Sequence, residues 1–95
     1  MENKYEKILS VLCNYKGITR IELISVLKDK NYKYLLFLFL KKYKCFDLVK
    51  LKEDFNMESK RSINYSCKKA KETFFVNKEF RELYFEVEDI ISKVI

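Results

Sequence analysis

The sequence predicts an all-α fold, a single domain of about six helices. Apolar side chains recur at intervals of three and four residues along almost the whole chain, which is the periodicity of amphipathic helices. The 95 residues include one glycine and no proline, so few residues interrupt a helix. None of the dipeptides that form tight hairpin turns, Asn-Gly, Asp-Gly or Gly-Gly, occurs. A chain of this length corresponds to one domain, residues 1–95.

The first two helices have clear boundary signals. Residues 3–15 carry one apolar stripe, and Gly17 then ends the helix in a turn. Thr19 and Glu22, three residues apart, form the capping box of a second helix. The apolar residues of this second helix are Ile21, Leu23, Ile24 and Leu27.

A polar, basic break at residues 28–33 is expected to precede the third helix. The run Tyr34–Leu40 is apolar throughout, which fits a buried strand or a buried helix. With its flanks the segment covers residues 32–44, which is too long for a typical strand. The lysines at its end suit the C-terminus of a helix, where the helix dipole favours positive charge. We therefore expect the central, most buried helix here.

Two polar residues mark the starts of the next two helices. Asp47 caps a short fourth helix that ends near Phe55, and residues 56–58 are expected to form a tight turn. Ser59 then caps a longer fifth helix. Its core stripe is expected to consist of Ile63, Cys67, Ala70 and Phe74. A short helix, a turn and a longer helix together follow the plan of a helix-turn-helix, whose second helix enters the DNA major groove.

The fifth helix carries polar and basic residues opposite its core stripe. Arg61 can donate two hydrogen bonds to guanine, and Asn64 can pair in the same way with adenine. Lysines there suit phosphate oxygens, and the two serines with the first helical amides suit one phosphate. The candidate DNA-binding residues of this helix are Ser59, Lys60, Arg61, Ser62, Asn64, Tyr65, Lys68, Lys69 and Lys71.

Charge is unevenly distributed along the chain. Residues 28–71 contain 13 basic and 5 acidic side chains, a net charge of +8, whereas residues 72–95 contain 3 and 6, a net charge of −3. A basic block of this kind attracts a polyanion to one face. Lys28, Lys30 and Lys33 in the basic break are candidates for a second contact, as a loop over a minor groove or a phosphate ridge.

The composition argues against an enzyme. The chain has no histidine for an imidazole base and a single glycine, too few for a phosphate-binding loop. Cys13, Cys45 and Cys67 match no metal or redox spacing, so we expect reduced thiols, no metal and no cofactor. No signal peptide is recognisable, and the longest apolar run has seven residues against about 20 for a membrane span. We expect a cytoplasmic protein without membrane contact.

The order of elements resembles the C-terminal DNA-binding domain of the bacterial replication initiator DnaA, a Trp-repressor-like helical domain. The resemblance covers nearly the whole chain and implies a helix-turn-helix scaffold that binds duplex DNA. The matching segments are Tyr5-Glu-Lys-Ile8, Ile21-Glu-Leu-Ile24, Leu35–Tyr43, Asp47–Phe55, Ser62–Lys69 and the final helix.

The chain also departs from that family. The family signature GGRDHTT stands here as Asn56-Met-Glu-Ser-Lys-Arg-Ser62, in which only Ser62 is similar in type. The basic stretch is shorter and less arginine-rich, and the family's ATP-binding module has no counterpart. The resemblance therefore implies a different DNA preference and does not imply initiator function.

The leading hypothesis is a small non-enzymatic protein that binds double-stranded DNA with some sequence preference. It would act in transcriptional regulation or in the replication and maintenance of a plasmid, phage or chromosome. The alternative is a helical protein-interaction module whose last helix, opened by Asn77, docks a partner or a second copy. A homodimer would use Phe80, Leu83, Tyr84, Val87 and Ile91. A structural alternative is a winged helix-turn-helix with a small β-hairpin that begins at residues 72–76.

Overall fold

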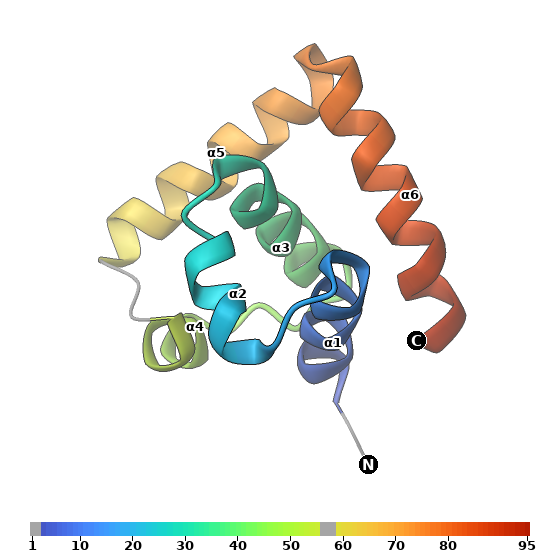
Figure 1. Cartoon of the computed structure of the whole chain (residues 1–95). Coiled ribbons are helices and arrows are strands. Elements are labelled where there is room, and N and C mark those ends of the chain that lie inside the picture. The colour runs from blue at the N-terminus through green and yellow to red at the C-terminus, as the bar shows by residue number, and fades with distance from the viewer. Residues whose placement is uncertain (1–2, 56–58) are drawn as a thin grey trace.

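The computed structural model describes residues 3–55 and 59–95 (Figure 1). Within these residues the chain forms six α-helices and no strand, as the sequence predicts. The alternative with a β-hairpin is wrong, because residues 72–76 form the end of the fifth helix. The predicted tight turn at residues 56–58 lies outside the described residues. The helices are α1 Lys4–Lys16, α2 Arg20–Val26, α3 Lys30–Lys42, α4 Leu48–Phe55, α5 Lys60–Val76 and α6 Lys78–Val94.

Side-chain caps fix most of the helix starts. Thr19 and Glu22 form the predicted capping box, in which each side chain accepts a hydrogen bond from the backbone amide of the other, at 3.2 Å and 3.1 Å. Asp47 accepts from the backbone amides of Val49 and Lys50 at the start of α4. Gly17 ends α1 with a φ of 68°, in the left-handed region that glycine adopts without strain.

Helix α3 begins earlier than the sequence pattern indicates. Asp29 caps it and accepts a hydrogen bond of 2.8 Å from the backbone amide of Asn31, so the helix starts at Lys30 and not near residue 32. Helix α3 ends at Lys42, and Lys44 follows with a left-handed φ of 58°. The predicted basic break at residues 28–33 is therefore wrong in its extent, because its last four residues are helical.

The core is built around α3, which packs against α1, α5 and α6. Its buried residues are Leu35, Leu36, Phe37, Phe39 and Leu40, each 1% exposed or less. This confirms that the apolar run forms the most buried helix. Helix α2 contributes fewer side chains to the core than its apolar content indicates. Leu23 and the C-cap residue Leu27 are buried, but Ile21 is 81% exposed and Ile24 is 42% exposed.

Helices α5 and α6 form a V around the other core helices (Figure 1). Asn77 alone separates them: it ends α5, and its side chain accepts a hydrogen bond from the amide of Phe80 to cap α6. The buried face of α5 includes the small residues Ser66, Cys67 and Ala70, which let the α5 backbone approach α3 closely. One long face of α5 is left pointing away from the core.

Candidate nucleic-acid interface

The predicted inward and outward sides of α5 are both observed. Ile63, Cys67 and Ala70 are buried, and Phe74 is half-buried against the same core. Ser59 caps the helix by accepting a hydrogen bond of 3.2 Å from the amide of Ser62. The outward face of α5 consists of the exposed residues Lys60, Arg61, Asn64, Tyr65, Lys68 and Lys71.

Three residues form a row along the outward face of α5. Arg61, Tyr65 and Lys68 are spaced at i, i+4 and i+7, so their side chains lie above one another on a helix. Tyr65 is 61% exposed, so most of its large aromatic ring is not used in the packing of the core. The row presents a guanidinium, an aromatic ring and an ammonium to whatever meets this face.

Lys69 is placed differently from its neighbour Lys68. Its ammonium forms an ion pair of 3.3 Å with Glu72 one turn along the helix and lies 5.7 Å from the centroid of the Tyr65 ring. The hydrogen bond to the Glu72 carboxylate raises the pKa of Lys69. Glu72 therefore offsets part of the charge of Lys69, whereas Lys68 takes part in no ion pair among the described residues.

The structure does not form a basic loop from Lys28, Lys30 and Lys33. Lys28 lies in the turn between α2 and α3, where its amide donates to the carbonyl of Ser25. Lys30 and Lys33 belong to the first turn of α3, and Lys33 is half-buried. In place of the expected loop, the structure has a turn at Lys28 and the start of α3 from Lys30 onwards.

The residues predicted for a homodimer are mostly committed to the core of the single chain. Phe80, Tyr84, Val87 and Ile91 are 9% exposed or less, and Leu83 is half-buried. Other apolar side chains of α6 face away from the core. These are Phe85, Ile90 and Val94, between 38% and 53% exposed.

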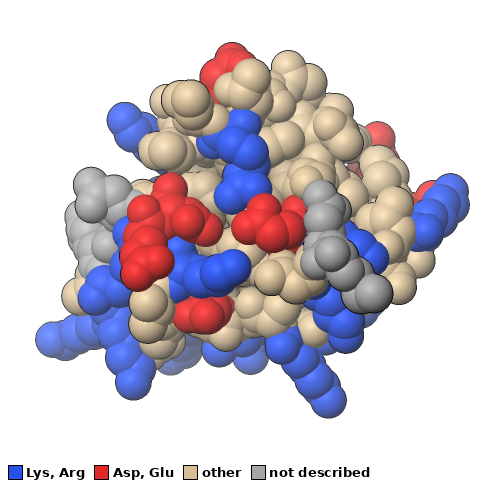
Figure 2. All heavy atoms as spheres, turned by 90° about the horizontal axis from the view of Figure 1, so that it is seen from below, with Lys and Arg blue, Asp and Glu red and all other residues tan. Residues whose placement is uncertain are grey.

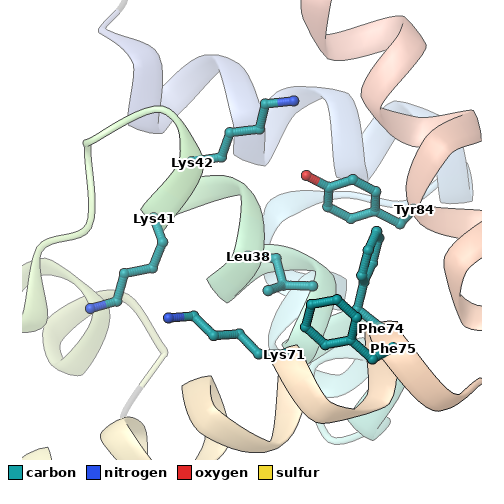
Figure 3. Close-up of a pocket in the computed structure, with 7 residues that line it drawn as sticks. All are labelled: Leu38, Lys41, Lys42, Lys71, Phe74, Phe75 and Tyr84. Carbon is teal, nitrogen blue, oxygen red and sulfur yellow. The ribbon is translucent and has the colours of Figure 1, made fainter.

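The structure also contains a pocket that the sequence does not predict. A pocket of about 380 Å³ lies between α3, α5 and α6, and three lysines surround its apolar floor (Figure 3). Sequence spacing places Lys71 on the outward face of α5, but it does not show that Lys41 and Lys42 of α3 lie beside it. The lining residues are Leu38, Lys41, Lys42, Lys71, Phe74, Phe75 and Tyr84.

Acidic side chains gather on a different face of the molecule. Figure 2 views the molecule from below, where carboxylates gather near the middle of the face and basic side chains surround them. Two contacts of acidic residues join helices of the N-terminal part of the chain: Arg20 pairs with Glu6 at 2.6 Å, and the Tyr5 hydroxyl donates to Asp54 at 2.7 Å. The face seen in Figure 2 therefore carries charges of both signs, whereas the charged residues of the outward face of α5 are all basic.

The cysteines are free thiols, and burial raises the pKa of Cys13, Cys45 and Cys67. In the described part of the chain, no group of three or more acidic, cysteine or histidine side chains is arranged to hold a metal ion. Along residues 3–55 and 59–95, none of the helices has both the length and the apolar content needed to cross a bilayer.

Comparisons with known proteins add no family assignment. No protein-family model matches the chain. Searches of curated proteins and of solved structures also found no similar protein.

Proposed function

We propose that this chain binds double-stranded DNA through the outward face of α5, as a non-enzymatic protein of the cytoplasm. The observation that carries the proposal is the composition of that face: four basic side chains, an asparagine and a tyrosine are all exposed along one side of a single helix. Helices α4 and α5 would act as the two helices of a helix-turn-helix, with α5 in the major groove. The free thiols agree with a reducing compartment.

Different residues of this face have different proposed roles. Arg61 and Asn64 would read base edges, because guanidinium and carboxamide groups make paired hydrogen bonds to guanine and adenine. Lys60, Lys68 and Lys71 would hold phosphates, and Ser59 and Ser62 lie where the first amides of α5 favour an anion. The cellular role would be transcriptional regulation, or replication and maintenance of a plasmid, phage or chromosome.

The test is an electrophoretic shift with duplex DNA of mixed sequence over a salt series. We expect affinity to fall steeply with salt, with a slope in log affinity of about −0.9 for each phosphate neutralised. Lys68→Glu should abolish the shift, because it reverses a charge on the outward face of α5. Lys78→Glu makes the same change on the exposed start of α6 and should have little effect. Absence of any shift at about 50 mM salt would rule the proposal out.

Self-association through α6 is a second candidate, favoured by the exposure of Phe85, Ile90 and Val94 on that helix. A dimer would place two α5 helices on two half-sites about 34 Å apart along DNA. Sedimentation at several concentrations decides it: one mass at all concentrations excludes the dimer.

A further inference from the structure

The pocket between α3, α5 and α6 opens onto a larger apolar surface. Four aromatic rings meet here, and we call them the aromatic corner: Phe74, Phe75, Tyr84 and Phe85. The ring of Phe74 lies 5.8 Å from that of Phe75, 5.0 Å from Tyr84 and 5.7 Å from Phe85, centroid to centroid. Phe75 is 75% exposed and Phe85 is 53% exposed, so two rings of a packed cluster face solvent. The neighbouring Val76 is 83% exposed. Exposed apolar side chains that gather in this way are characteristic of binding surfaces.

Three cations lie around the pocket, and the fold neutralises one of them. Lys42 forms an ion pair with Glu88. Lys41 and Lys71 take part in no ion pair among the described residues, and no acidic side chain lines the pocket. Lys41 instead extends over the ring of Phe46, with its ammonium 4.3 Å from the ring centroid. In Figure 3 the ends of Lys41 and Lys71 lie on one side of Leu38, and the aromatic rings lie on the other.

An occupant of this site therefore needs two properties. It must present a large apolar group to Leu38 and the aromatic corner, and a negative charge to Lys41 and Lys71. A free small molecule fits poorly, because small-ligand sites enclose most of their ligand. Here one wall is the mostly exposed Phe75, and apolar surface continues past the pocket to Phe85. A longer ligand would cover this surface.

A second copy of the chain fits less well. A two-fold contact sets the same surface of each copy against the other. It would offer no carboxylate to Lys41 and Lys71, because no acidic side chain among the described residues lines the pocket. A two-fold dimer through this surface would therefore leave both lysines without an acidic partner.

We infer that the pocket and the aromatic corner bind an acidic segment of a partner protein, which inserts a large apolar side chain beside Leu38 and sets a carboxylate against Lys41 and Lys71. The inference does not rest on the proposed DNA binding. Lys71 also belongs to the outward face of α5, so a bound acidic segment would reduce the positive charge of that face.

The experiment measures fluorescence anisotropy with three short labelled peptides. The probe peptide has a central Phe-Leu pair flanked by Asp and Glu. One control replaces the Phe-Leu pair with serines and keeps the acids, and the other replaces the acids with lysines and keeps the Phe-Leu pair. We expect the probe peptide to bind at least about tenfold more tightly than either control. If the serine control bound as tightly as the probe peptide, the site would simply attract any polyanion. If the lysine control bound as tightly as the probe peptide, the site would bind apolar groups without regard to charge. Either result overturns the inference.

Protein variants locate the site. Lys71→Glu and Phe75→Ala change exposed side chains, so both variants should fold, which circular dichroism checks. Each should weaken binding of the probe peptide by about tenfold, whereas Lys52→Glu, an equal charge change on the exposed side of α4, should not. Unchanged binding in both pocket variants would overturn the inference. So would a concentration-dependent dimer, seen by sedimentation, that Phe75→Ala abolishes, because a second copy would then be the occupant.

Discussion

Helices α5 and α6 have the same length, 17 residues, and share Asn77, yet they are used in opposite ways. Helix α5 carries five basic residues and one acidic residue, whereas α6 carries three basic and five acidic residues. The buried face of α5 includes small residues such as Ser66 and Ala70, whereas α6 buries the large side chains of Phe80 and Tyr84. Large buried side chains are thus concentrated on the inner face of α6, and exposed basic side chains are concentrated on the outer face of α5.

The strongest test of this comparison removes a large side chain from α6. Phe80 is 2% exposed and its ring packs edge-on against Tyr34, so Phe80→Ala should lower the free energy of unfolding by about 3–5 kcal/mol. Phe85→Ala removes the same atoms from a ring that is 53% exposed and should cost less than about 1 kcal/mol. Urea denaturation measures both. Equal losses would contradict the assignment of α6 to the core.

The converse test adds volume to α5. Ala70 is fully buried where α5 meets α3, so Ala70→Leu should destabilise the fold by about 1–3 kcal/mol through overpacking. The midpoint of thermal unfolding reports the change. A variant as stable as the wild type would show that α5 does not depend on small residues for its approach to α3.

A third test separates residues on the outward face of α5 and depends on the proposed DNA binding. Arg61→Ala should cost about 1–3 kcal/mol on a preferred site and relax the sequence preference. Lys68→Ala should weaken all duplexes about equally and flatten the salt dependence. Titration of a selected duplex and a random duplex distinguishes the two. If both variants behave alike on both duplexes, no base is read by Arg61.

The smallest expected effect lies at the junction of the two helices. Arg81 of α6 donates hydrogen bonds of 2.9 Å and 3.0 Å to the carbonyls of Phe74 and Phe75 at the end of α5. Arg81→Ala should therefore lower the free energy of unfolding by about 1 kcal/mol. Lys78→Ala, which removes only a 4.0 Å ion pair between exposed side chains, should be close to neutral. A neutral Arg81→Ala would show that the junction does not need this cap.

The sequence predicts those features that one helix determines by itself. The capping box of Thr19 and the caps by Ser59 and Asn77 depend on residues three positions apart, and the buried stripe of α5 depends on periodicity alone. The start of α3 differs from the prediction because the apolar run begins at Tyr34, whereas the cap at Asp29 starts the helix at Lys30, four residues earlier.

Features that depend on how helices cross could not be predicted. The exposure of Ile21 reflects the side of α2 that meets α1, which periodicity within α2 does not specify. The pocket joins Lys41 of α3 to Lys71 of α5, 30 residues apart in the chain, and only their packing brings them together. Most of the candidate DNA-binding residues are exposed, whereas Lys33, Ser62 and Lys69 are partly buried, and contact with DNA stays a prediction.

The single residue between α5 and α6 also limits how this chain can vary in length. Asn77 has an extended backbone and caps α6 through the amide of Phe80, three residues further on. One residue inserted after Asn77 would break this spacing, remove the cap and lengthen the junction that holds Phe80 and Val87 in the core. We therefore expect natural variants of this protein to tolerate many substitutions on the outer surface of α6 but no insertion or deletion at Asn77.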